Sequence, residues 1–237
     1  MINENVLHQK RVVQILCGLL IFIQVILYAS TYSLAALFGQ LQYPVYMISD
    51  TISGDPGRAI ASFFFPMLAI LIFVIGGSRI SRMHPIFTNN YDGSIRKWRI
   101  DGRLFSVLHV SLITTVVGVV GVAAVPVTLE PILHTIIAGI MIGAGTLSSV
   151  LFTILDYRLG IVRARWIKNA RVFIAAFGVA AAITFGVLLE SEPFAASVFE
   201  IIETLIFSIY LTTFGHPLEF PLVVDGGQLP LASNPPI

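Results

Sequence analysis

Charged residues and cysteine are scarce in this chain. Of its 237 residues, 11% are Asp, Glu, Lys or Arg and 56% are hydrophobic, whereas soluble domains carry about 25% charged residues. So few charges would not keep a chain of this length soluble, but they suit a helical bundle whose outer surface faces lipid. The single cysteine, Cys17, excludes an intrachain disulfide framework.

The sequence motifs of soluble enzymes are also missing. The chain has no Walker loop, no His-Glu-x-x-His, no Gly-x-Ser-x-Gly and no paired Cys-x-x-Cys. We therefore predict no metal site and no cofactor, and we assign no catalytic residue.

Six long apolar stretches predict an all-α membrane protein with six transmembrane helices in one bundle. An apolar helix needs about 20 residues to cross the hydrocarbon of a bilayer. The transmembrane domain is expected to cover residues 12–215, between an N-terminal segment of residues 1–11 and a Pro-rich tail of residues 216–237. The expected spans are residues 12–34, 59–77, 104–125, 131–155, 172–189 and 194–214.

The basic residues predict the orientation of these spans. Of the 14 Lys and Arg residues, 13 precede the first span or lie between spans two and three or four and five. All these segments fall on one side of a six-span chain. Because basic loops are retained in the cytosol, we expect both termini to be cytosolic. The predicted membrane topology already accounts for the distribution of the basic residues, so we expect no nucleic-acid partner.

One basic segment has a further predicted role at the membrane surface. Trp98 lies among Arg96, Lys97 and Arg99. Tryptophan favours headgroup depth, and clustered basic residues attract anionic cytosolic lipids. These four residues are therefore predicted to anchor the chain to the cytosolic lipid surface.

The opposite face gathers ionisable residues, among which Arg58 is the only Lys or Arg. Glu130 and His134 are four residues apart and share one helix face, as do Glu200 and Glu203 at a spacing of three. Charges near the hydrocarbon are costly, so they should point into the bundle or toward water. The candidate lipid-binding residues are Asp50, Arg58, Glu130, His134, Glu200 and Glu203.

Two interpretations of these residues stay open. In the first, the Arg58 guanidinium binds a lipid phosphate, while His134 and a carboxylate orient a hydroxyl or ester. In the second, Asp55, Glu130 and Glu200 cap helix N-termini and pair within the bundle.

The fourth expected span contains Gly139 and Gly143, a Gly-x-x-x-Gly pair. Small residues at this spacing let helix backbones approach closely in lipid. We predict that both glycines serve helix packing, either within the bundle or between two chains.

Three short motifs together suggest a family. They are Ile48-Ser49-Asp50-Thr51 followed by Pro56 and the run Phe63–Phe65, His134 followed by Ala138 and Gly139, and Thr213-Phe214 followed by Glu219-Phe220. Over about residues 12–220 the chain resembles the DRAM/Frag/Sfk group of six-helix membrane proteins. The resemblance implies a eukaryotic endomembrane or plasma-membrane protein concerned with lipids.

Three function classes follow from these observations. The leading hypothesis is a lipid-related, non-transporting membrane protein that binds lipid headgroups at the non-cytosolic leaflet. The second is a structural or accessory subunit that meets membrane-protein partners through the fourth span or the tail. The third, which the family resemblance brings in, is an enzyme that remodels GPI anchors or phospholipids.

Overall fold

The computed structural model describes residues 4–40, 47–52, 54–89, 95–161 and 164–216. These residues form helices and no strand. The helices are α1 (Glu4–Leu37), α2 (Ile48–Thr51), α3 (Gly57–Asn89), α4 (Ile95–Ala124), α5 (Pro131–Leu159), α6 (Arg165–Leu188) and α7 (Pro193–Thr212), followed by the 3-10 turn η1 (Thr213–Gly215).

Six of these helices are long and apolar enough to cross a membrane, which confirms the predicted six-span, all-α fold. Each expected span falls on one of them. Several helices continue well beyond the apolar stretch, since α3 runs on to Asn89 and α4 already begins at Ile95. The predicted tail lies outside the described residues from residue 217 onward.

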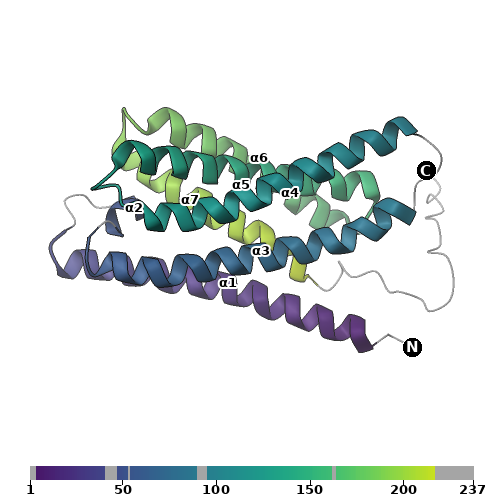
Figure 1. Cartoon of the computed structure of the whole chain (residues 1–237), viewed down its shortest axis with the longest axis horizontal. Helices are drawn as coiled ribbons and strands as arrows, with labels where there is room; N and C mark the ends of the chain where they lie inside the picture. Colours follow the sequence, from purple (N-terminus) through teal and green to yellow (C-terminus); the bar gives the residue numbers. More distant parts are fainter. Residues whose placement is uncertain (1–3, 41–46, 53, 90–94, 162–163, 217–237) are drawn as a thin grey trace.

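The six long helices lie roughly side by side, and consecutive helices pack against one another (Figure 1). The last helix α7 and the turn η1 also contact α1, so the first and last parts of the bundle meet. The short helix α2 contacts α1 and α7. The two ends of the described chain lie at the same end of the bundle.

Proline and glycine set several helix ends. Pro131 and Pro193 occupy the first turns of α5 and α7, where the missing amide hydrogen costs no intrahelical bond. Gly160 follows α5 with φ of +63°, the left-handed conformation that glycine adopts without steric strain at a helix C-terminus.

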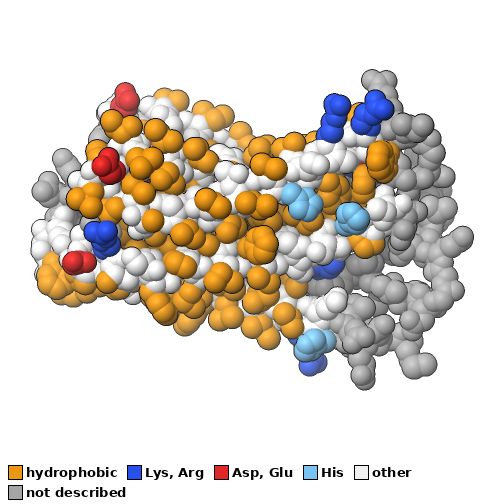
Figure 2. Space-filling model, in the orientation of Figure 1, with side chains coloured by type: hydrophobic (Ala, Val, Ile, Leu, Met, Phe, Trp, Pro, Cys, Tyr) orange, Lys and Arg blue, Asp and Glu red, His pale blue; other side chains and the backbone are white. Residues whose placement is uncertain are grey.

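The two ends of the bundle differ in charge, and an apolar band separates them (Figure 2). We call one end the acidic end, where α3, α5 and α7 begin; its sequence carries Asp50, Asp55, Glu130, Glu190 and Glu192. The other is the basic end, where α1, α4 and α6 begin. Between them, exposed side chains such as Phe22, Val110 and Phe173 give the helices a lipid-compatible surface.

Candidate functional site

A pocket of about 320 Å³ opens at the acidic end between α2, α5, α6 and α7. Its polar part is lined by Ser49 and Asp50 of α2, His134 of α5 and Glu200 of α7. Three of the predicted candidate residues, Asp50, His134 and Glu200, thus meet in one pocket. We refer to it as the acidic-end pocket.

Glu200 fixes the polar part of the pocket by holding α2 in place. Its Oε2 accepts a hydrogen bond of 2.7 Å from the backbone N–H of Ile48, in the first turn of α2. Ser49 adds hydrogen bonds to the same carboxyl through its backbone and its side chain. Glu200 therefore caps the N-terminus of a neighbouring helix, since the first N–H groups of a helix lack intrahelical acceptors.

Replacing Glu200 with alanine is expected to loosen α2 from the bundle. The Ile48 amide is buried, and a buried donor without an acceptor costs about 1–3 kcal/mol. Hydrogen exchange at Ile48 should become faster in Glu200→Ala but stay slow in Glu200→Gln, whose side-chain carbonyl still accepts. Glu192→Ala, at an exposed site of the same end, is the control. Unchanged exchange in Glu200→Ala would contradict the capping role.

His134 contributes a buried ring whose two nitrogens have different surroundings. The side chain is only 3% exposed. Its Nδ1 lies 2.5 Å from the carbonyl oxygen of Val125, in the turn between α4 and α5. Because a carbonyl oxygen can only accept, Nδ1 carries the hydrogen. The second nitrogen, Nε2, is buried and has no hydrogen-bond partner among the residues that the structure describes.

Asp50 lies at the exposed edge of the pocket. Desolvation by the surrounding protein raises the pKa of its carboxyl above the usual value, while the nearby imidazole of His134 lowers it. The two side chains therefore interact electrostatically across the polar part of the pocket.

The deeper part of the pocket is apolar and open. It runs along α5 from His134 to Gly143, a distance of about 13 Å at about 1.5 Å per residue. Gly139 and Gly143 on this face are exposed. A Cβ atom built on Gly139, Gly143 or Gly186 of α6 would meet no atom within 4 Å. Among the described helices these small residues leave space instead of bringing two helices together.

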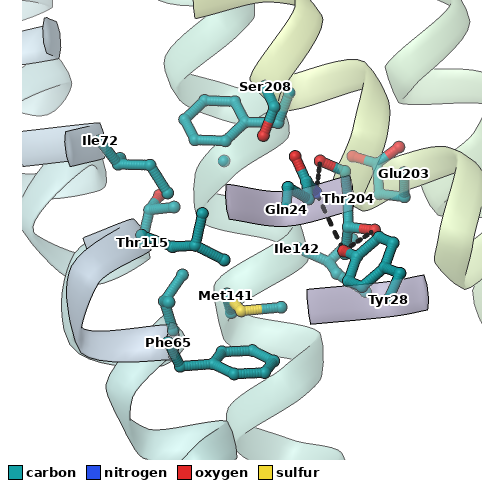
Figure 3. Close-up of a pocket in the computed structure, with 14 residues that line it drawn as sticks. Gln24, Tyr28, Phe65, Ile72, Thr115, Met141, Ile142, Glu203, Thr204 and Ser208 are labelled. Carbon is teal, nitrogen blue, oxygen red and sulfur yellow. Dashed lines mark hydrogen bonds between the residues drawn. The ribbon is translucent and has the colours of Figure 1, made fainter. Parts of the chain in front are cut away.

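Glu203 faces a different cavity, deeper in the bundle (Figure 3). This cavity of about 60 Å³ is lined by residues of α1, α3, α4, α5 and α7. The Oε1 atom of Glu203 accepts a short hydrogen bond from Thr146. On the same side of the cavity as Glu203, Gln24 donates to Tyr28 at 2.9 Å and to the carbonyl oxygen of Thr204 at 3.0 Å. Glu203 therefore lies in a different site from the candidates that line the acidic-end pocket.

A comparison with known families places these features in context. The family model described as the Frag1/DRAM/Sfk1/Cwh43P N-terminal domain matches residues 10–218. The chain belongs to this family. The resemblance predicted from the short motifs is thereby confirmed. No curated protein and no solved structure gives a match.

Two predicted lipid-binding residues of this family member lie outside the acidic-end pocket. Arg58, in the first turn of α3, is exposed and does not line it. Glu130 occupies the position before α5 but makes no capping hydrogen bond with its side chain. A lipid-binding role for these two residues stays a prediction.

The predicted surface anchor lies in the first turns of α4 at the basic end. Trp98 is 53% exposed and stacks on Phe87 of α3 with ring centroids 6.3 Å apart. Arg99 is exposed. The side chains of Arg96 and Lys97 lie outside the described part of the structure, so the anchor stays a prediction.

A buried ionic cluster near the basic end was missed by the sequence analysis. Arg79 of α3 and Arg171 of α6 both bind Asp156 of α5, with N–O distances of 2.5 and 2.6 Å. Both arginines are 1% exposed and Asp156 is 2% exposed. The sequence had assigned both arginines to the basic segments between spans, whereas the structure places them inside helices.

Thr213 and Phe214, at the end of the bundle, complete this cluster. The ring of Phe214 lies beneath both guanidinium groups, with Arg79 and Arg171 Cζ atoms 5.2 and 4.8 Å from its centroid. The Nε of Arg171 donates to Thr213 Oγ1 at 2.8 Å. The negative face of the aromatic ring attracts both guanidinium groups. We call these five residues the arginine cluster.

Proposed function

We propose that this member of the Frag1/DRAM/Sfk1/Cwh43P family binds a membrane lipid in the acidic-end pocket. The observation that carries the proposal is the division of the pocket into a polar part at Asp50, His134 and Glu200 and an apolar part between α5 and α6. A membrane lipid likewise combines a polar headgroup with apolar acyl chains. The exposed Gly139 and Gly143 leave the pocket open toward the lipid side of the bundle, so a lipid could enter laterally.

We further infer that the pocket serves the non-cytosolic leaflet. The rule that basic segments stay in the cytosol puts the basic end, and both termini, on the cytosolic side. The acidic end then faces a lumen or the cell exterior. The resemblance to the family favours a eukaryotic endomembrane or the plasma membrane.

Binding of a partner helix is the competing function. Gly139 and Gly143 are exposed on the same face, and small residues at this spacing accept a close helix in lipid. An accessory subunit would use this face to enter a larger assembly. A lipid and a partner helix would occupy the same opening, so one set of variants tests both.

Filling the apolar part of the pocket should displace the lipid. Leucine at Gly139 or Gly143 would occupy space where no protein atom lies within 4 Å of the new Cβ, so the fold should tolerate it. We expect Gly139→Leu and Gly143→Leu, purified in a mild detergent, to lose most of the phospholipid that mass spectrometry detects per mole of wild-type protein.

The control is Gly18→Leu on α1, another exposed glycine with open space around its Cβ. It should retain lipid as the wild type does. Full lipid retention in both pocket variants would reject the proposed function. Loss of a co-purifying protein with unchanged lipid would instead support the accessory-subunit function.

A further inference from the structure

We propose that residues 219–224 of this chain, which follow shortly after the last described residue His216, dock into a pocket at the basic end of the bundle and place the ring of Phe220 against Trp166. The inference goes beyond the proposed lipid binding, because this pocket lies at the opposite end from the acidic-end pocket. Its basis is the place where the described chain stops, together with the shape and charge of the surroundings.

The pocket has a volume of about 390 Å³ and lies between α1, α6 and the turn η1. Gln14 of α1 and Trp166 in the first turn of α6 line it and are exposed, whereas Cys17, Ile167 and Gly215 line it and are buried. The Trp166 side chain is 56% exposed, so much of an indole ring is open to a ligand. We call this cavity the basic-end pocket.

The walls of the basic-end pocket are fixed by contacts within the bundle. A Cβ atom added to Gly215 would lie 3.4 Å from the Sγ of Cys17 and 3.4 Å from the Cα of Gln14, so η1 packs closely on α1. On the other side, the Nε of Arg171 donates a hydrogen bond to Thr213 Oγ1 and ties η1 to α6. A preformed pocket binds a ligand without first having to become ordered, which favours affinity.

The chain passes out of the described residues at the edge of this pocket. His216 lines the pocket, and its ring meets that of Trp166 edge-on with centroids 4.7 Å apart. Its backbone is extended, with φ of −64° and ψ of 134°, as the residue before a proline prefers. Phe220 lies within about 14 Å of His216, because an extended chain spans at most about 3.6 Å per residue. This short tether gives residues 219–224 a local concentration in the millimolar range, so weak contacts suffice to hold them in the pocket.

The chemistry of the segment fits an open aromatic pocket. Residues 220–224 read Phe-Pro-Leu-Val-Val, an uninterrupted apolar run. Aromatic rings pair favourably with one another, and aromatic-lined grooves also bind segments that contain proline. Phe220 supplies the ring, and Pro221 restricts the backbone that follows it. Docking also removes the apolar surface of this run from water.

Charge favours the same occupant. Residues 216–237 contain no Lys or Arg, and the proposed segment begins with Glu219. Arg165, the first residue of α6, is exposed, and Lys10 lies one turn before Gln14 on the same face of α1. These basic residues attract an acidic segment, whereas the anionic lipids of the cytosolic leaflet, which the predicted topology places at this end, repel it. The pocket is therefore a better site for the segment than the membrane surface.

The first test measures how strongly acrylamide quenches the fluorescence of Trp166 in the full-length chain, purified in one detergent. The sequence has two tryptophans, so Trp98→Phe leaves Trp166 as the only reporter. In this background, Phe220→Asp should lower the docking equilibrium constant at least about tenfold, because the buried ring is lost, and quenching of Trp166 should rise. Leu231→Asp adds the same charge outside the proposed segment and should change nothing. With Trp166→Phe, the reporter Trp98 should not respond to Phe220→Asp.

A disulfide cross-link tests the position of the segment directly. Cys17→Ala removes the single native cysteine, and Gln14→Cys is then combined with Leu222→Cys. A disulfide needs Cα atoms within about 7 Å of each other, so oxidation should link this pair within one chain. The matched control uses Ile15→Cys in place of Gln14→Cys and should not link, because Ile15 is exposed and does not line the pocket.

Each outcome supports or overturns the docking of this segment. Unchanged quenching of Trp166 in Phe220→Asp overturns it, as does an equal rise in Leu231→Asp. Links between two chains instead of within one would assign the pocket to a second copy and also overturn it. Equal linking of the Ile15→Cys control shows that the segment does not occupy the pocket. The cross-linked variants keep Phe220 and Trp166, so this arm stands even if a quenching variant folds poorly.

Discussion

Asp156→Ala is expected to yield little folded protein after detergent extraction. Asp156 binds both Arg79 and Arg171, and both arginines are 1% exposed. Removing it would take the shared carboxylate away from two buried guanidinium groups that both lie close to the Phe214 ring. Breaking a buried ion pair by deleting one partner costs about 3–5 kcal/mol, a large part of the total stability of a typical domain. Size-exclusion chromatography after heating to a series of temperatures would measure the loss.

A variant that removes all three charges provides the matched control. Replacing a complete buried ionic cluster with apolar residues of similar volume is often neutral or stabilising. Arg79→Met, Asp156→Leu and Arg171→Met together should therefore melt at a higher temperature than Asp156→Ala alone. If Asp156→Ala melts like the wild type, the arginine cluster does not hold α3, α5 and α6 together.

The sequence could predict the helices because the membrane imposes a strong pattern on them. About 20 apolar residues are needed for each crossing, and the positions of Lys and Arg were consistent with an even number of crossings before each basic segment. The exact ends were harder to predict. A span predicted from hydropathy ends where charged residues begin, but the helices α3 and α4 continue through charged residues such as Arg79 and Asp101.

The arginine cluster escaped prediction for the same reason. Arg79 and Arg171 stand at the edges of apolar stretches, where a charge usually marks the membrane surface. Asp156 offsets the cost of burying them because it contacts both in space, although it is 77 residues from Arg79 in the chain. The sequence did contain one signal, because Asp156 is an acidic residue directly after the fourth expected span, on the side of the membrane where the basic residues gather.

The acidic-end pocket was predicted in part. Asp50, His134 and Glu200 were expected at one face of the membrane, and they line one pocket. Glu203 was expected to share the face of Glu200. Three residues along a helix correspond to about 60° around the axis and about 4.5 Å along it. This offset is enough to turn Glu203 toward the cavity of Figure 3, whose other walls come from helices that the sequence could not arrange.

Two glycine-to-alanine variants should change stability in opposite directions. A Cβ on Gly118 of α4 would lie 2.7 Å from the Cβ and 3.0 Å from the Cα of Met141 on α5. The Cα belongs to the backbone of the neighbouring helix, so the two helices would have to separate. Overpacking of this kind costs about 1–3 kcal/mol. Gly118→Ala should therefore lower the melting temperature in detergent.

Gly139→Ala should have the reverse effect, although it adds the same methyl group to the facing helix. A Cβ there meets no atom within 4 Å, and alanine in a helix interior is favoured over glycine by about 1 kcal/mol. The variant should melt at or slightly above the wild-type temperature. If both variants lose stability equally, Gly139 is in close contact with another helix in the purified protein. Because the described helices leave that space open, a helix packed there would come from a second protein or a second copy, and the predicted packing role of Gly139 and Gly143 would then apply between chains.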